Sequence, residues 1–102
     1  MMKEFDEVNN PERYTAHCSM ECISVMKLTF GKEAVANFCM LNAFKYMWRY
    51  KKKNGLEDLR KANWYLDYIE DYLDERFYDV ELFNRLCDLL KDLFYLEGEN
   101  KS

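Results

Sequence analysis

The fold is decided by residues 32–76, KEAVANFCMLNAFKYMWRYKKKNGLEDLRKANWYLDYIEDYLDER, where two stretches with helical periodicity flank one turn. The turn is Asn54-Gly55, a dipeptide typical of tight turns. Because the link is short, we expect helices over residues 32–52 and 56–76 to form an antiparallel hairpin. The apolar positions of the second helix recur every three or four residues, as one buried helical face requires: Leu56, Leu59, Ala62, Leu66, Ile69 and Leu73.

The helix predicted for residues 32–52 is apolar around most of its circumference, which indicates a central position with neighbours on several sides. With residues placed about 100° apart, one polar strip remains along this helix. The strip begins beside Phe38 and comprises Asn42, Lys45, Arg49, Lys52 and Lys53.

Two further helices are predicted, one before and one after the hairpin. Ser19 can cap a helix over residues 20–30, which Gly31 ends. Asp79 can cap a helix over residues 79–96, and the apolar arc of that helix is wider than a small bundle covers, so we expect a homo-oligomer. The chain has 102 residues with only 3 Gly and 1 Pro, too few turn-formers for a β-rich fold. We therefore predict an all-α fold, a compact bundle of about four helices around a central hairpin, in one domain.

The charge of the chain restricts its partners. A formal net charge of -4 disfavours tight nonspecific binding to duplex nucleic acid, which requires an excess of basic side chains. Cations are nevertheless concentrated between residues 45 and 53, a segment without any acid. They are Lys45, Arg49, Lys51, Lys52 and Lys53. A cluster this small suits the few phosphates of a small molecule better than a duplex.

No apolar stretch of about 18 or more residues occurs, and no basic segment followed by an apolar one begins the chain. We therefore expect no membrane span and no signal peptide, and predict a cytoplasmic protein whose four cysteines are reduced. Cys18 and Cys22 lie one helical turn apart beside His17, which leaves zinc binding open as an alternative to plain thiols. Their spacing matches no standard zinc site.

The corner between the two hairpin helices is the candidate functional site. Arg49, Lys52 and Lys53 should meet the amino end of the second helix there, where exposed backbone amides attract anions. The alternative is a solvated basic face that is favoured only by the dipole of the first helix. The aromatic side chains near enough to stack on a base are Trp48, Tyr50, Trp64 and Tyr65.

Acidic residues add two further hypotheses. Glu21 is the only acid predicted in the helix over residues 20–30, and it could pair with Lys45 or Arg49, or bind a sugar hydroxyl or a metal. A magnesium site like that of all-helical nucleotide pyrophosphohydrolases needs paired acids on two helices, but residues 32–52 contain only Glu33. The acids available on the other helix are Asp67, Glu70, Asp71 and Asp74. The chain has no Gly-x4-Gly-Lys-Ser/Thr phosphate loop, which excludes a standard P-loop kinase.

Four blocks of sequence carry a resemblance to a known family: residues 10–14 (NPERY), 20–23 (MECI), 38–49 (FCMLNAFKYMWR) and 52–66 (KKNGLEDLRKANWYL). Through these blocks, residues 10–69 resemble the SaV-like family of small phage proteins, a domain of unknown function. The same region looks like the carboxyl-terminal half of the P-loop-less deoxynucleoside monophosphate kinase of T-odd coliphages.

The resemblance implies a nucleotide pocket on the polar strip, with Glu21 facing it. The pocket residues that it implies are Asn42, Lys45, Arg49, Lys52, Asp58 and Lys61. Together with the pattern at the corner, it suggests phosphate contacts from Arg49, Lys52 and Lys53. Asn42 and Glu21 would then contact sugar or base, and Trp64 or Tyr65 would stack.

Three functions fit these residues. The first is a non-enzymatic sponge that sequesters a nucleotide immune signal in the cytoplasm of a phage-infected host. The second is a kinase-like enzyme of deoxynucleotide metabolism, which would need a second nucleotide and Mg²⁺; no cofactor is otherwise certain. The third is a structural adaptor without a small ligand. For either nucleotide-binding function, Arg49→Ala should weaken ligand binding and leave the helicity nearly intact.

Overall fold

A computed structural model of the protein describes residues 19–98. This part of the chain forms four α-helices and two short 3-10 helices and contains no strand, which confirms the all-α prediction. The elements are α3 (Met20–Phe30), α4 (Lys32–Arg49), η1 (Tyr50–Lys52), α5 (Leu56–Tyr72), η2 (Glu75–Phe77) and α6 (Val80–Leu96).

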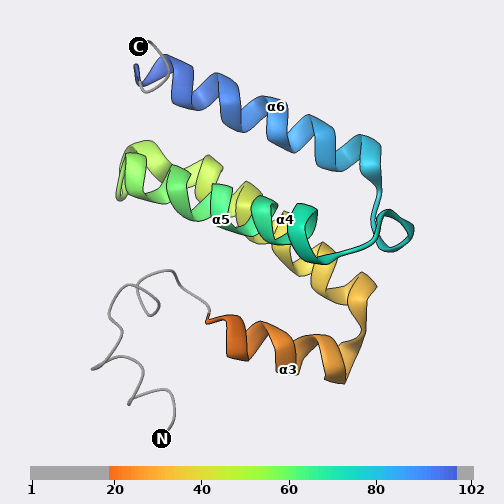
Figure 1. The fold of residues 1–102 in the computed structure, drawn as a ribbon. Helices are drawn as coiled ribbons and strands as arrows, with labels where there is room; N and C mark the ends of the chain where they lie inside the picture. Colours follow the sequence, from red (N-terminus) through yellow and green to blue (C-terminus); the bar gives the residue numbers. More distant parts are fainter. Residues whose placement is uncertain (1–18, 99–102) are drawn as a thin grey trace, which may run out of the picture.

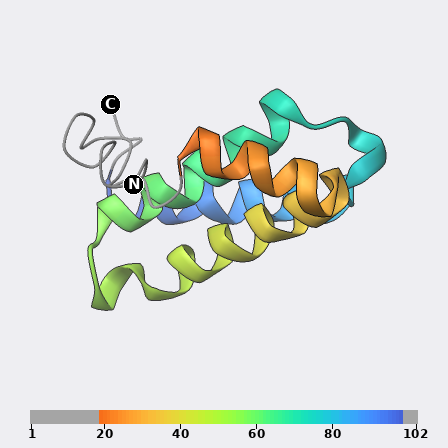
Figure 2. The ribbon, with the colours of Figure 1, turned by 90° about the horizontal axis from the view of Figure 1, so that it is seen from below.

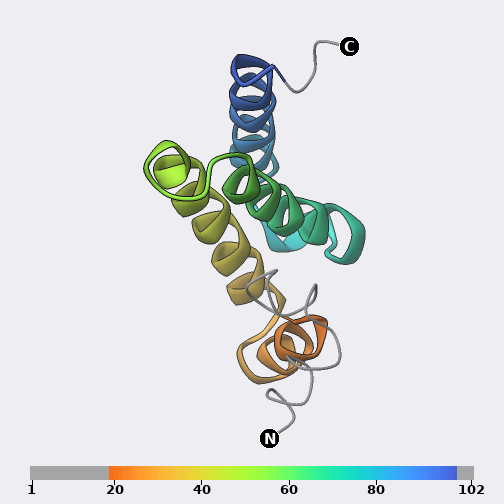
Figure 3. The same cartoon turned by 90° about the vertical axis from the view of Figure 1, so that its left-hand side faces the viewer.

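The helices α4 and α5 form the predicted central hairpin, and α3 and α6 pack on it (Figure 1). In Figure 2 the link between α4 and α5 lies at one end of the hairpin, and the link between α5 and α6 lies at the other. Figure 3 shows α6 and α3 at opposite ends of the molecule with the hairpin between them. Because α4 contacts each of the other three helices, it is the central helix, as its composition predicts.

The ends of α3 and α6 follow the predicted capping. Oγ of Ser19 accepts a hydrogen bond from the backbone nitrogen of Cys22 at 3.0 Å. Oδ1 of Asp79 accepts one from the backbone nitrogen of Leu82 at 3.1 Å. Each bond satisfies an amide of the first helical turn that has no partner within the helix. Both helix starts are therefore determined by their local sequence.

The end of α5 differs from the prediction. The sequence predicts a helix through Arg76, but α5 ends at Tyr72. Leu73 then adopts an extended backbone conformation, with φ -118° and ψ 142°, and its side chain is buried. Asp74 caps η2 by accepting a hydrogen bond from the backbone nitrogen of Arg76 at 2.9 Å. Leu73 keeps its predicted place in the core although it lies outside the helix, so the apolar spacing alone does not reveal the break.

The core lies between α4 and α5 and is closed by side chains of α3 and α6. The predicted apolar stripe of α5 is confirmed, because all its members are buried except Leu56, which is partly buried. Ile23 of α3 and Phe83 and Leu90 of α6 complete the core from the flanks. Each large apolar side chain buried in this way contributes roughly 1.5–3 kcal/mol of hydrophobic free energy. The buried residues of α4 are Val35, Ala36, Cys39, Met40, Ala43, Tyr46 and Met47.

One apolar row of α4 is exposed, although the sequence predicts that the helix is covered around most of its circumference. Leu41 is 70% exposed, Phe44 47% and Trp48 80%. These residues lie on successive turns, and the rings of Phe44 and Trp48 are 6.1 Å apart. The prediction fails here because a helical apolar pattern does not distinguish a face buried in the core from one left at the surface.

Candidate functional site

The corner between α4 and α5 is built from a short 3-10 helix and a turn. The sequence predicts one helix through Lys52, but α4 ends at Arg49 and η1 carries the chain onward. The carbonyl oxygen of Tyr50 accepts hydrogen bonds from the backbone nitrogens of Lys53 at 3.4 Å and Gly55 at 2.8 Å. Gly55 has a φ of 62°, which glycine adopts without strain, and α5 begins at the next residue. The Asn-Gly turn signal is therefore confirmed.

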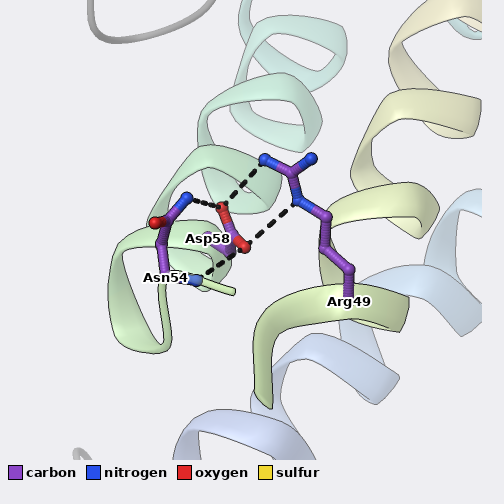
Figure 4. A network of polar contacts seen from close by, with 3 residues as sticks. All are labelled: Arg49, Asn54 and Asp58. Carbon is purple, nitrogen blue, oxygen red and sulfur yellow. Dashed lines mark hydrogen bonds and ion pairs between the residues drawn. The ribbon is translucent and has the colours of Figure 1, made fainter. Parts of the chain in front are cut away.

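Asp58 is fully buried near the start of α5 and holds this corner together (Figure 4). Arg49 donates from Nε to Oδ2 of Asp58 at 3.2 Å and from Nη2 to Oδ1 at 3.4 Å. Asn54 donates from its backbone nitrogen to Oδ2 at 3.3 Å and from Nδ2 to Oδ1 at 3.2 Å. Each carboxylate oxygen thus accepts two hydrogen bonds, which fills the acceptor capacity of the group.

This arrangement changes the roles expected of Arg49 and Asp58. The sequence assigns both to a ligand pocket, whereas the structure joins them to each other. The carboxylate of Asp58 supplies negative charge close to the amino end of α5, where the sequence predicts a ligand phosphate. Arg49 nevertheless keeps 33% of its side chain exposed, and its Nη1 makes no bond to Asp58 (Figure 4).

The pKa of the Asp58 carboxyl results from two opposing effects. Burial raises the pKa, because it disfavours the charged form. The hydrogen bonds from Arg49 and Asn54 lower it, and together they prevail, so the pKa lies below its ordinary value. Asp58 is therefore ionised at neutral pH, and the corner contains a true ion pair.

Three cations surround the ring of Tyr46, and we call these four side chains the cation cluster. Nζ of Lys45 and Cζ of Arg49 each lie 4.7 Å from the ring centroid, and Nζ of Lys61 lies 5.6 Å from it. All three are within the range of a favourable cation–π contact. Lys45 and Arg49 come from α4 and Lys61 from α5. Within residues 19–98, Arg49 pairs with Asp58, and neither Lys45 nor Lys61 forms an ion pair. The cluster therefore carries an excess of positive charge.

The aromatic residues below the cluster form a stack in the interior. The ring of Tyr65 lies 6.1 Å from that of Tyr46 at an interplanar angle of 15°. The rings of Phe38 and Trp64 meet Tyr65 edge-on, at 5.7 Å and 5.2 Å. Tyr65 is only 2% exposed, so the base-stacking role predicted for it does not fit the structure. Trp64 is partly buried and keeps some accessible surface.

The other members of the polar strip are Asn42 within α4 and Lys52 and Lys53 beyond its end. Asn42 is partly buried one turn before the cation cluster, and its Nδ2 donates to the carbonyl oxygen of Phe38 at 2.9 Å. Its side-chain oxygen makes none of the hydrogen bonds found among the described residues. Lys52 and Lys53 are exposed at the corner, in η1 and the following turn. Their backbones belong to the corner, and their side chains extend the basic surface toward solvent.

Glu21 does not meet the strip in the predicted way. It is exposed on α3, and no ion pair within the described part of the chain links it to Lys45 or Arg49. The predicted pairing across the bundle is therefore corrected. A helical pattern fixes which face of α3 carries Glu21, but not which side chains of α4 that face meets.

The sequence pattern does not point to two contributors to the site, Asn54 and Tyr46. Asn54 is recognised only as a turn residue, although its position four residues before Asp58 could have indicated a side chain that bonds to the first turn of α5. Tyr46 is assigned only to the apolar face, although it lies next to Lys45 and one turn from Asn42. No spacing rule indicates that Lys61 of α5 reaches the same ring, because this contact depends on the packing of the hairpin.

A cavity of about 180 Å³ lies between α5 and α6 and does not touch the cation cluster. Burial and the charges of Asp71 and Glu70 raise the pKa of Asp67 in its wall, and Asn63 partly opposes this by hydrogen bonding. Burial also raises the pKa of the Cys87 thiol. An acidic wall disfavours phosphate. The lining residues are Asn63, Leu66, Asp67, Glu70, Cys87, Leu90, Lys91 and Phe94.

Residues 19–98 contain neither a group of metal ligands nor a membrane-spanning helix. No three His, Cys, Asp or Glu side chains are grouped so that they could hold a metal ion. None of the helices in that part is both long and apolar enough to cross a bilayer. Cys22 is exposed on α3, while His17 and Cys18, its partners in the zinc alternative, lie outside the described residues.

Comparison with known proteins identifies a family. The family match covers residues 8–67, more than half of the chain. The chain belongs to the DUF3310 family. DUF3310 is described as a family of proteins of unknown function. The matched region nearly coincides with residues 10–69, over which the sequence resembles a domain of unknown function. The DUF3310 region contains the hairpin corner and the whole cation cluster, whereas α6 lies beyond it. No curated protein and no solved structure matches the chain.

Proposed function

We propose that this DUF3310 protein binds a phosphorylated nucleotide on the cation cluster. The observation that carries the proposal is the convergence of Lys45, Arg49 and Lys61 on Tyr46, with Asp58 as their bonded carboxylate. Three cations held close together repel one another, and one carboxylate offsets only part of that repulsion. A ligand with two or more negative charges would offset the rest.

The framework of the corner favours binding because it is already ordered. The ion pair with Asp58 fixes the guanidinium of Arg49, so its remaining N–H groups can donate to a phosphate without first losing side-chain entropy. Lys45 and Lys61 supply charge from the two sides of the hairpin. Lys52 and Lys53 extend this basic surface toward further phosphates.

Asn42 and Trp64 are the side chains that we assign to the sugar and the base of the nucleotide. The side-chain oxygen of Asn42 can accept a hydrogen bond from a ligand, because the bond to the Phe38 carbonyl uses the side-chain nitrogen. Trp64 is, with Phe38, one of the two partly exposed rings of the aromatic stack, and it is the residue that we assign to a base. These contacts would add selectivity to a site whose affinity comes from charge.

The carboxylate at the corner favours retention of the ligand over turnover. All four hydrogen bonds to Asp58 serve the fold, so this group is not available as a base or a magnesium ligand. We therefore propose a sponge that holds a nucleotide, such as a phage protein that sequesters an immune signal of its host. A kinase-like reaction is the alternative, and it would require Mg²⁺ and a second nucleotide.

A single experiment separates these functions. Purified protein is incubated with nucleoside mono- and diphosphates, cyclic nucleotides, and ATP with Mg²⁺, and the melting temperature is measured with each. The ligand is then recovered by heat denaturation and identified by mass spectrometry. An unchanged ligand supports the sponge, and a new nucleoside diphosphate supports the kinase. The absence of any shift in melting temperature would contradict nucleotide binding.

Substitution of the two lysines locates the ligand. Lys45→Ala and Lys61→Ala should each weaken binding about tenfold, because each removes one charge-assisted contact. Lys91→Ala is the matched control, since Lys91 lines the acidic cavity between α5 and α6 and should leave binding unchanged. Circular dichroism checks that the helices persist. Equal weakening by all three variants would mean that binding depends on net charge alone.

An adaptor without a small ligand is the second candidate, and one observation favours it. The exposed row of Leu41, Phe44 and Trp48 on α4 is a large apolar surface for a small monomer. An adaptor would use this row and leave the cation cluster solvated. In that case none of the nucleotides would shift the melting temperature.

A further inference from the structure

The helix α6 carries two apolar rows rather than one. The inner row faces the bundle and comprises Phe83, Cys87, Leu90 and Phe94, all buried or partly buried. The outer row lies beside it and recurs at alternating intervals of four and three residues: Leu82, Leu86, Leu89, Leu93 and Leu96. This alternation is the pattern by which one helix packs lengthwise against another in a coiled coil.

The protein itself covers the outer row only in part. Leu89, in the middle of the row, is 39% exposed, Leu82 is 40% exposed and Leu96 is 68% exposed. Leu86 and Leu93 are partly buried against the core. The helix lies at the outer side of the bundle (Figures 1 and 3), and Leu82, Leu89 and Leu96 expose the row at its start, middle and end.

The two flanks of the outer row differ. On one flank the row borders Phe83 and Leu90, which belong to the protein's own core. On the other flank Arg85 and Asp92 lie seven residues apart and therefore on the same side of α6. Arg85 makes only a long contact with Glu81, at 3.9 Å between exposed groups. Opposite charges at equivalent positions of one helix complement each other when two copies run in opposite directions.

We propose that the outer row of α6 packs against the same row of a second copy of this chain, with the two helices antiparallel. Leu86 then lies beside the partner's Leu89, and Leu82 beside the partner's Leu93. The same register leaves Arg85 and the partner's Asp92 offset by only about 3 Å along the helix axis. A two-fold axis makes every one of these contacts twice.

The charges specify the direction of pairing. In a parallel pair, Arg85 would face the partner's Leu90, because flanking residues of parallel coiled coils meet five positions apart. Leu90 is buried in the core, so Arg85 would gain no charged neighbour. The antiparallel pair provides two Arg–Asp contacts instead. The proposal does not depend on nucleotide binding, because α6 lies outside the cation cluster.

Sedimentation velocity over a range of protein concentrations tests the pairing. The wild-type protein should be a dimer, and Leu89→Glu should raise the dissociation constant at least about a hundredfold, because it places a carboxylate in the apolar contact of both copies. Leu41→Glu is the matched control, since Leu41 is an exposed leucine of α4, and it should leave the dimer intact. Circular dichroism checks that both variants stay helical.

A charge exchange tests the direction. Arg85→Glu should weaken the dimer about tenfold, because it sets two acids against each other at both ends of the contact. Combining Arg85→Glu with Asp92→Arg should restore the affinity. A wild-type chain that is monomeric at every concentration overturns the proposal, whatever other protein then covers α6. It is also overturned if Leu41→Glu dissociates the dimer and Leu89→Glu does not, or if the double variant fails to restore the affinity.

Discussion

Asp58 is the residue on which the corner depends, because its charge is buried and all its partners come from the hairpin. Two of its four hydrogen bonds come from Arg49 and two from Asn54. The pair with Arg49 is asymmetric, since the arginine side chain is 33% exposed and the carboxylate 0%. Loss of the arginine therefore leaves a buried anion, whereas loss of the aspartate leaves a cation that water can reach.

Arg49→Ala should lower the free energy of unfolding by about 2 kcal/mol, because it removes the cation from a buried carboxylate. The exposure of Arg49 keeps the loss below that of a fully buried pair. The substitution should therefore lower stability in addition to weakening ligand binding, while the helicity stays nearly intact. Urea denaturation measures the change, and a double-mutant cycle with Asp58→Ala isolates the interaction between the two side chains.

Arg76→Ala provides the control for that substitution. Arg76 pairs with Asp74 at the same Nε–Oδ distance, 3.2 Å, but both side chains are exposed, by 78% and 54%. Its loss should change the free energy of unfolding by less than about 0.5 kcal/mol. Equal losses in the two variants would contradict the structural role given to the buried pair.

The pH dependence of stability should reflect Asp58. Its pKa is lowered in the folded state, so the unfolded chain takes up the proton at a higher pH than the folded chain does. The stabilisation is present above the unfolded pKa, near 3.9 for an aspartate, and is lost as the pH falls through the folded value. Asp58→Asn should therefore show a smaller loss of stability on acidification, measured by urea denaturation at a series of pH values. Parallel curves for the two proteins would contradict the assignment.

At the scale of the elements, the turn between η1 and α5 depends on one glycine. Gly55 has φ 62° and ψ -133°, a region open to glycine and closed to other residues, although a Cβ there would meet no neighbour within 4 Å. Gly55→Ala should thus cost about 1–2 kcal/mol through backbone strain alone. Thermal or urea unfolding measures it. Lys53→Ala, in the same turn, should remain within about 0.5 kcal/mol of the wild type.

The helices themselves were largely predictable from local signals. Ser19 and Asp79 fixed two helix starts because their side chains bond to amides three residues on. The ends of α4 and α5 were less predictable, since apolar periodicity continues through Tyr50 and Leu73 while the backbone changes conformation. Both side chains stay buried although they lie outside the α-helices, so the apolar pattern continues past the helix ends.

The candidate site was predictable in its location but less so in its bonds. The strip of Asn42, Lys45 and Arg49 follows from helical spacing, and the Asn-Gly turn brings it to the start of α5. Spacing does not reveal that Arg49 is paired within the protein or that Lys61 reaches the ring of Tyr46. Those contacts depend on the rotation of α5 about its axis, which the packing of the hairpin sets.

At the scale of the whole molecule, the bundle has a central layer with one helix on each side. The central hairpin is covered by α3 on one side and α6 on the other (Figure 3). Within residues 19–98, each outer helix packs on the hairpin with one face. The exposed rows on α4 and α6 are therefore expected of an arrangement that has too few helices to cover all its apolar surface.

The link between Arg49 and Asp58 also bears on how the chain reaches this shape. The two residues are 9 positions apart. The loop that must close is therefore short, and its closure costs little conformational entropy. The bond from Tyr50 to Glu97 spans 47 positions and requires most of the described chain to be in place. We therefore expect the hairpin to form first from neighbouring residues and α6 to dock onto it later.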